Sequence, residues 1–210
     1  PIKAALDKIE DVKSFFFKHY TPLNATLVVA GNVQKDQVIT LAEKWFGPIP
    51  PGVKYQRNIA PEPKQSEARK LAVTAPVPLD AFYKCWHICS RTDDRYYAAD
   101  LITDILGGGA SSRLFQSLVK EKQLFRNIDC YHFGSSDNGL ITIEGKLVKN
   151  ITMKDAEAAV DAELLRLKTD GISESELEKV KNKAESAMAF EDMSLMNRAS
   201  SLAMYELLGD

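Results

Sequence analysis

Side chains that commonly bind metals stand on alternate positions of two strand-like segments. Cys85, His87 and Cys89 would share one face of the first segment. Cys130 and His132 repeat that spacing on a possible neighbouring strand. Structural zinc sites, however, usually take paired ligands from turns, and catalytic zinc sites need an open position beside an acid or base. The pattern therefore favours buried cysteines and partnered histidines, with a zinc site as the less favoured alternative.

Other catalytic arrangements lack the partners that their chemistry requires. The three histidines, His19, His87 and His132, are far apart, and no H-E-x-x-H or H-x-x-E-H motif places two of them one helical turn apart. No serine lies in a G-x-S-x-G elbow. The sequence alone therefore predicts no catalytic residue and no metal ligand.

A glycine run, Gly107 to Gly109, precedes Ala110 and two serines and could place backbone amides around an anion. No Gly-Lys-Ser/Thr follows, and the run leaves a helix rather than a strand, so a nucleotide-binding loop is not favoured. We expect the glycines to end one helix and to expose backbone amides. Because three glycines are costly to order, a positive φ or a close backbone approach should justify them.

The composition of the 210 residues is that of a globular protein, with 45% hydrophobic and 27% charged residues. The 27 basic residues nearly balance the 29 acidic ones, so no strong field recruits nucleic acid. The longest apolar stretches are far shorter than the roughly 20 residues of a membrane span. Three cysteines cannot all pair within the chain, which favours a reducing compartment and leans toward the cytoplasm without fixing the localisation.

Hydrophobic periodicity and turn residues predict an α+β fold with a largely antiparallel sheet. A Pro-rich, polar segment at residues 48–68 is predicted to be an interdomain linker. The predicted helices lie at residues 11–20, 38–47, 94–106, 111–122 and 156–171, and from a capping box at Ser173 and Glu176 toward Leu208, with breaks. The predicted strands lie at residues 25–30, 69–75 and 79–90, and in a hairpin of residues 126–133 and 140–147.

Two parts of the sequence resemble signatures of one peptidase family. Residues 16–31, FFKHYTPLNATLVVAG, continuing to Trp45-Phe46-Gly47, are similar to the end of the catalytic domain in insulinase- and pitrilysin-type inverzincin zinc peptidases. This family includes the mitochondrial processing peptidase. Residues 106–115, LGGGASSRLF, and residues 173–178, SESELE, resemble the LGGG-x-SSRL and E-x-E-L signatures of the second, zinc-free domain.

The resemblance implies how the chain is divided. Residues 1–47 would end a preceding catalytic-type domain, residues 48–68 would be the linker, and residues 69–210 would form the zinc-free second domain. In such peptidases each domain has a sheet covered by helices. The strand at 25–30 is expected either to close the first sheet or to complete the second, within one chain or by exchange between two copies.

The resemblance also implies what the chain does. In the family, the zinc histidines and the general-base glutamate lie in H-x-x-E-H upstream of the matched region, so zinc is implied for the parent protein and no cofactor for this chain. The region would help to close over an extended peptide, like one half of a clamshell, and alone would not cut peptides. Its expected partners are the upstream catalytic domain, a peptide or unfolded protein substrate, and another copy of itself.

Site residues follow from the same resemblance. A longer glycine-rich loop handles presequences in the processing peptidases, which gives Gly107, Gly108, Gly109 and Ser112 a possible substrate-binding role. Many active members also carry L-R-x-x-x-x-L-x-Y, whose arginine and tyrosine help to position the substrate carbonyl. Alignment on two leucines, Leu118 and Leu124, puts Val119 at the arginine position and Arg126 at the tyrosine position.

Neither residue is expected to act as this helper. Val119 offers no hydrogen-bond donor, and Arg126 is expected about two helical turns from the position of the family's guanidinium. This departure favours one alternative to the peptidase-domain hypothesis, a structural or assembly subunit of the same fold, like the core proteins of respiratory complexes. A third hypothesis is an unrelated α+β binding module, which would be favoured if residues 24–31 did not form a strand.

Overall fold

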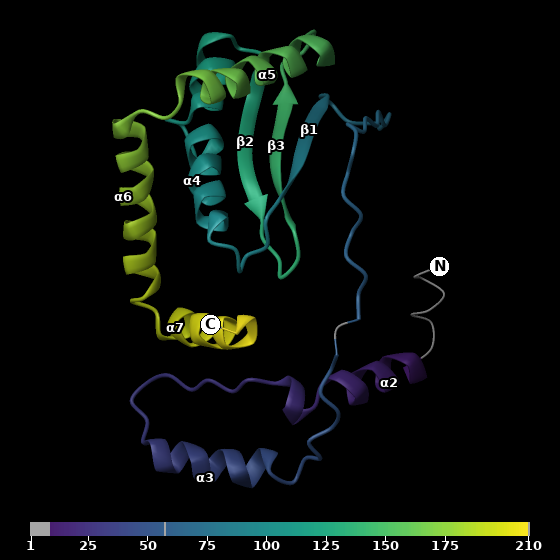
Figure 1. Cartoon of the computed structure of the whole chain (residues 1–210), viewed down its shortest axis with the longest axis vertical. Coiled ribbons are helices and arrows are strands. Elements are labelled where there is room, and N and C mark those ends of the chain that lie inside the picture. The colour runs from purple at the N-terminus through teal and green to yellow at the C-terminus, as the bar shows by residue number, and fades with distance from the viewer. Residues whose placement is uncertain (1–8, 57, 210) are drawn as a thin grey trace. The chain divides into compact units, whose positions relative to one another are not determined.

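The computed structural model describes residues 9–56 and 58–209 (Figure 1). Helices and one three-stranded antiparallel sheet make up the fold, which confirms the predicted α+β class. The chain forms two compact units, and each is described by itself. The helical unit comprises the described residues of Pro1–Glu62 and Met188–Asp210, and the sheet unit comprises Pro63–Ala187. The last residues thus group with the helical unit, whereas the sequence assigned 69–210 to one domain.

The sheet has the order β1-β3-β2, so the last strand in sequence is the central one. Its strands are β1 (Ala81–Ile88), β2 (Phe125–Phe133) and β3 (Gly139–Leu147). The strand predicted at 79–90 and the hairpin predicted at 126–133 and 140–147 are confirmed. The strand predicted at 69–75 is wrong, since β1 pairs only with β3 and these residues have no ladder partner in the described part of the chain.

The register divides the side chains of the sheet between two faces. Phe82, Ile128 and Ile143 belong to the first face and lie in the hydrophobic core, whereas Tyr83 and Tyr131 belong to the second. The first face is covered by α4 (Arg95–Gly107), the π-helix η2 (Phe115–Glu121) and α5 (Met153–Asp170) (Figure 1). On the second face, which we call the open face, most side chains of the strands are exposed.

The predicted helices of the sheet unit form with changed boundaries. The helix expected at 111–122 is the π-helix η2, in which Lys122 N donates to Ser117 O at 2.9 Å. α5 begins at the cap Thr152, whose hydroxyl accepts from Asp155 N at 3.1 Å. α6 (Glu174–Glu191) begins at the predicted capping box, which is described with the site below. The chain then turns before α7 (Leu195–Leu208), one of the expected breaks.

The glycine run behaves partly as predicted. α4 ends at Gly107, where a Cβ would overlap the backbone nitrogen of Cys130, so a glycine lets α4 approach β2 closely. Gly109 has a φ of +100°, a conformation that glycine adopts without strain. The expected exposure of the amides is wrong, because they are hydrogen-bonded at 2.8–3.0 Å. Gly108 N donates to Asp104 O in the last turn of α4, and Gly109 N and Ser112 N donate to carbonyls of the glycine run itself. Three glycines are therefore explained by a helix end and its packing.

The helical unit contains α2 (Ile9–His19), a short 3-10 helix at Pro22–Asn24, α3 (Lys35–Phe46) and α7. The helices predicted at 11–20 and 38–47 are confirmed, and the second begins three residues earlier, at Lys35. The strand predicted at 25–30 does not form, because these residues find no ladder partner among the described ones, so they complete neither sheet in this chain. None of the described helices is long and apolar enough to cross a membrane.

The helices of the helical unit pack loosely. None of α2, α3 and α7 has a buried residue, and the segment after α2 is held mainly by the Asn24 side chain. Its amide nitrogen donates to His19 O at 3.2 Å, and its oxygen accepts from Tyr55 N at 2.7 Å. The closed hydrophobic core of the chain therefore lies in the sheet unit.

Candidate functional site

The cysteines and histidines flagged by the sequence do not come together. β3 lies between β1 and β2, and Cys85 is opposite Thr142, whereas Cys130 is opposite Ile143. Because neighbouring residues of a strand point to opposite faces, the Cys85 and His87 side chains lie on the open face and the Cys130 side chain on the helix-covered face. In residues 9–56 and 58–209 no group of three or more potential ligands could hold a metal ion.

On the helix-covered face, these residues are a buried cysteine and a partnered histidine, as the sequence favoured. His132 Nε2 lies 2.8 Å from Tyr96 Oη, and its Nδ1 lies 3.4 Å from Thr103 Oγ1. Cys130 is buried, and burial raises the pKa of its thiol to about 12. Cys85 departs from the prediction of buried cysteines, since it is exposed on the open face.

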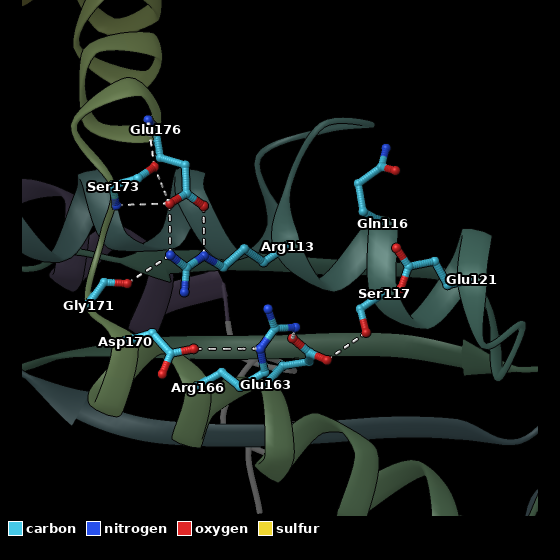
Figure 2. A pocket seen from close by; sticks show the side chains of 10 residues that line it. All are labelled: Arg113, Gln116, Ser117, Glu121, Glu163, Arg166, Asp170, Gly171, Ser173 and Glu176. Carbon is cyan, nitrogen blue, oxygen red and sulfur yellow. Dashed lines mark hydrogen bonds and ion pairs between the residues drawn. The ribbon is translucent and has the colours of Figure 1, made fainter.

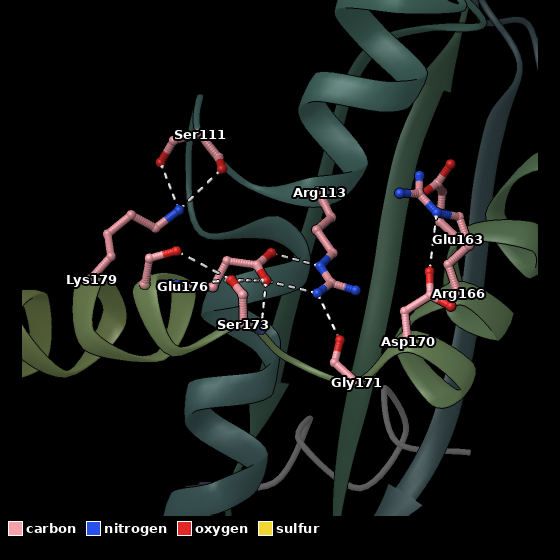
Figure 3. Close-up of polar contacts among 10 residues, drawn as sticks. Ser111, Arg113, Glu163, Arg166, Asp170, Gly171, Ser173, Glu176 and Lys179 are labelled. Atoms are coloured by element: carbon pink, nitrogen blue, oxygen red, sulfur yellow. Dashed lines mark hydrogen bonds and ion pairs between the residues drawn. The ribbon is translucent and has the colours of Figure 1, made fainter.

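The two signatures of the zinc-free domain meet in space at an ion pair (Figure 3). Arg113 Nε and Nη2 donate to the two carboxylate oxygens of Glu176 at 2.7 and 2.8 Å. Arg113 Nη2 also donates to Gly171 O at 2.8 Å, where the chain leaves α5. Lys179 donates to Ser111 O and Oγ at 3.1 and 3.2 Å. The segment before η2 is thereby fastened to the start of α6.

The capping box contributes to the same ion pair. Ser173 N donates to Glu176 Oε2 at 3.0 Å, and Glu176 N donates back to Ser173 Oγ at 3.3 Å. The hydrogen bonds from Arg113 hold the pKa of Glu176 down to about 2, and those to Glu176 raise the pKa of Arg113. One carboxylate thus caps α6 and anchors the LGGG-x-SSRL segment. The residues of both signatures therefore stabilise the fold.

A buried carboxylate ties η2 to α5 nearby. Glu163 is 2% exposed and accepts from Ser117 Oγ at 2.6 Å, Lys122 Nζ at 3.2 Å and Arg166 Nη1 at 3.1 Å. Burial alone would raise the pKa of Glu163, but the hydrogen bonds from Ser117 and Lys122 outweigh it and the pKa is lowered. The buried charge of Glu163 therefore has hydrogen-bond donors and cations beside it, as expected of a residue that stabilises the fold.

These polar groups surround a shallow pocket of ≈ 420 Å³ (Figure 2). Its two arginines are paired with its carboxylates, because Arg113 contacts Glu176 and Arg166 contacts Glu163. The pocket is lined by residues of η2 and the segment before it, of α5, of the connection after α5 and of the start of α6: Arg113, Gln116, Ser117, Glu121, Glu163, Arg166, Asp170, Gly171, Ser173 and Glu176. Mutual pairing leaves this pocket with the character of a stabilising network rather than a ligand site.

The predicted substrate-binding residues lie beside this network but outside the pocket. Ser112 is 1% exposed, and its hydroxyl donates to Gly109 O at 2.7 Å, so it stabilises the turn instead of facing a ligand. Gly107 is buried against β2, whereas Gly109 is exposed. A substrate role for Gly107 to Gly109 stays a prediction, and of the three it is Gly109 whose backbone is most open to a peptide.

The two helper positions lie on different elements. Val119 lies in η2 and packs against the core. The chain leaves the helix after Glu121, passes Gln123 at a φ of +51°, and enters β2, where Arg126 is the extra residue of a β-bulge. The expectation that Arg126 lies about two helical turns away is therefore wrong, because strand rather than helix separates it from Val119.

The open face carries a group of side chains that the sequence did not single out. Tyr83 Oη donates to Glu144 Oε1 at 3.2 Å, and Tyr131 Oη donates to Glu144 Oε2 at 2.8 Å. The hydrogen bond to Glu144 raises the pKa of Tyr83 and raises that of Tyr131 to about 12. Strand alternation placed these residues on one face, but only the pairing order brings β1, β3 and β2 side by side.

Comparison with known families agrees with this geometry. Residues 8–184 match the family model described as "Peptidase M16 inactive domain". The chain belongs to the peptidase M16 family. This confirms the predicted kinship with the zinc-free domain of zinc peptidases.

Relatives and solved structures support the M16 assignment. The chain is 28% identical over 199 residues to the protein named "Uncharacterized zinc protease YmxG" of Bacillus subtilis (strain 168), covering 95% of this chain and 47% of that protein. A crystal structure of a protease from Helicobacter pylori matches with a TM-score of 0.87 and 25% identity, over 97% of this chain and 50% of that one.

A further M16 structure shows the same fold. The peptidase M16 inactive domain from Pseudomonas fluorescens matches with a TM-score of 0.77 and 20% identity, over 94% of this chain and 46% of that one. The M16 chain described here spans about half the length of the relatives that it matches. What the other half of such proteins contributes is therefore treated below as a proposal.

Proposed function

We propose that this chain is the non-catalytic half of a zinc metallopeptidase and that it captures extended peptide for a catalytic half encoded upstream. The observation that carries the proposal is a sheet that the described helices of its own unit cover on one face, within a domain whose family model is described as inactive. The open face leaves aromatic and polar side chains free for a ligand. A clamshell of two such halves would enclose the peptide between them.

The helical unit supports the other part of this proposal. Residues 1–47 would end the preceding catalytic-type domain, and residues 48–68 would link it to the zinc-free domain. Large apolar side chains of α3, such as Trp45 and Phe46, are exposed, as expected of a helix whose covering domain lies elsewhere. The upstream half would bury them.

The cysteines and histidines of the two strands, and the other described residues, do not fit a zinc ion. Cys85 and His87 lie on the face opposite to Cys130 and His132, and the nearest partners of His132 are Tyr96 and Thr103. Zinc and its general base would therefore be supplied by an H-x-x-E-H motif upstream. This chain would contribute shape, rigidity and peptide contacts.

Purification of the chain alone and with the upstream half of its parent tests the proposal. We expect the chain alone to carry no stoichiometric zinc and to leave a panel of unstructured peptides intact. Addition of the upstream half should give hydrolysis that a chelator abolishes. Stoichiometric zinc and chelator-sensitive hydrolysis by the chain alone would contradict the proposal.

A structural or assembly subunit of the same fold is the second candidate. It is favoured by the helper positions, since Val119 packs against the core and Arg126 lies in a bulge of β2. The sequence upstream of this chain in its parent distinguishes the two. An intact H-x-x-E-H motif there supports the peptidase, and its loss supports the subunit.

A further inference from the structure

The open face has an acidic centre that crosses all three strands. In the register, Glu144 of β3 lies directly opposite Tyr83 of β1 on one side and Asp129 of β2 on the other. Directly opposite side chains of an antiparallel pair point to the same face. Tyr131, two residues from Asp129, also points to this face and donates to Glu144. Two carboxylates and two phenol rings thus meet on one exposed surface.

These two carboxylates have no balancing cation among the residues that the structure describes. Neither Glu144 nor Asp129 forms an ion pair with a described residue. Lys146 lies on the same face of β3, one row further along, and pairs with neither. Like charges directly opposite each other in a sheet are destabilising. The arrangement therefore costs stability in the free chain and would be relieved by a bound cation.

Glu144 is prepared to accept more than the two phenols. An ionised carboxylate has about four acceptor sites, and the tyrosine hydroxyls occupy one on each oxygen. The remaining sites can accept from an ammonium or guanidinium group in a charge-assisted hydrogen bond. The two tyrosines hold the carboxylate in place, so its side chain loses little conformational entropy when a ligand binds.

The surrounding rings suit an organic cation rather than a metal ion. Tyr83 and Phe133 are each 60% exposed, and the Tyr131 and Phe133 rings meet edge to face with centroids 5.2 Å apart. Aromatic faces attract cations, and their apolar surface accommodates the methylene stem of a long basic side chain. A carboxylate set among such rings discriminates a basic side chain from a neutral one.

From these observations we propose that Glu144 and Asp129, with the rings of Tyr83 and Tyr131, form a docking site for one lysine or arginine side chain of an extended peptide. The inference rests on the proposed peptide-capturing function and adds a preference for basic substrates. The charge of Glu144 and Asp129 carries the choice of partner, because a pair of carboxylates that forms no ion pair with a described residue is complementary to a basic segment. A neutral or acidic peptide would gain nothing from these carboxylates.

Binding of two short fluorescent peptides to the full 210-residue chain tests the proposal. One peptide carries a single central arginine, and the other carries citrulline, its uncharged counterpart, at the same place. We expect the arginine peptide to bind at least about tenfold more tightly at low salt, because a charge-assisted bond to a carboxylate is lost with citrulline. Glu144→Gln should bring the two affinities within about twofold of each other.

Three controls separate the possible failures. Glu144→Gln must still bind the citrulline peptide as the parent chain does, which shows that the variant is folded. Glu185→Gln, an exposed change on α6, should leave the preference for arginine intact. Asp129→Asn should weaken the preference by less than Glu144→Gln, because Asp129 receives no hydrogen bond from either tyrosine.

The outcomes discriminate between this inference and the function on which it rests. Equal affinity for both peptides would overturn the basic docking site and leave peptide capture standing. A preference for arginine that survives both Glu144→Gln and Asp129→Asn would also overturn it, since the cation would then bind elsewhere. Binding of neither peptide would remove peptide capture and the docking site together. A chain that dimerises through this face, with Tyr131→Ala making it monomeric, would replace the peptide by a second copy.

Discussion

The two units of the chain differ in how they are held together. In the sheet unit, Leu118, Phe125 and Ile143 lie in a closed core and charged groups tie the helices to one another. In the helical unit, α2, α3 and α7 have no buried residue, and large apolar side chains such as Trp45 remain exposed. A core is the main source of stability in a small domain, so we expect the sheet unit to be much more stable than the helical unit in the isolated chain.

The two family signatures and the candidate binding residues also differ in what they do. The LGGG-x-SSRL and E-x-E-L stretches meet in the Arg113–Glu176 ion pair and stabilise the sheet unit. The residues that can still accept hydrogen bonds from a ligand lie elsewhere, on the open face around Glu144. Motifs recognised in this chain therefore report on the fold, and the candidate binding surface is read from the sheet register.

The largest expected effect comes from the core of the sheet unit. Leu118→Ala should lower the free energy of unfolding by about 2–5 kcal/mol, because a fully buried leucine leaves a cavity. Leu207→Ala on α7, where the leucine is exposed, should change it by less than about 0.5 kcal/mol. Urea unfolding followed by circular dichroism measures both. Equal losses would show that the helical unit has a core of comparable weight.

The next effect concerns the close approach of α4 to β2. Gly107→Ala should destabilise the sheet unit by about 1–3 kcal/mol, because the added Cβ overlaps the backbone at Cys130 and forces the elements apart. Gly109→Ala should cost about 1 kcal/mol, from the positive φ alone, since no atom lies near its Cβ position. Thermal unfolding of the two variants gives the comparison, and a larger loss at Gly109 would contradict the packing argument.

A smaller effect is expected from the ion pair that joins the two signatures. Glu176→Gln should lower the free energy of unfolding at neutral pH by about 1–2 kcal/mol, since the pair is partly exposed and solvent screens it. Glu178→Gln, at an exposed position two residues further along α6, serves as the matched control and should change the free energy of unfolding very little. Chemical unfolding at pH 7 measures both variants.

The same ion pair should be lost in acid. The pKa of Glu176 is about 2 in the folded chain against an ordinary 4.5, so the unfolded chain binds the proton more readily. Its contribution is complete above pH 4.5 and disappears as the pH falls from 4.5 toward 2. The difference in stability between the parent chain and Glu176→Gln should therefore shrink over this range. A difference that is independent of pH would mean that the charge of Glu176 is not what stabilises the fold.

The helices and the hairpin could be predicted because their signals are local. The capping box at Ser173 and Glu176, and the glycines that follow α4, mark helix ends within a few residues. The strands expected at 25–30 and 69–75 failed for the opposite reason. Their β-branched residues favour extended backbone, but a strand needs a partner far away in sequence, and none of the described residues supplies one.

The candidate site was out of reach for the same physical reason. Tyr83, Asp129 and Glu144 come from three strands, and only the order β1-β3-β2 places the glutamate between the other two. The sequence suggested instead that the strand of Cys85 neighbours that of Cys130, which the inserted β3 rules out. Pairing order is a tertiary property, and alternation along one strand does not reveal it.

The central proposal is that the sheet unit is stabilised by its own core, whereas the helical unit would be covered by an upstream half. Amide hydrogen exchange of the chain, alone and bound to that half, tests it most directly. Alone, the amides of α3 should exchange more than about a hundredfold faster than those of the central strand β3, because α3 buries no side chain. Addition of the upstream half should slow α3 and leave β3 unchanged. Exchange at α3 as slow as at β3 in the isolated chain would contradict the account.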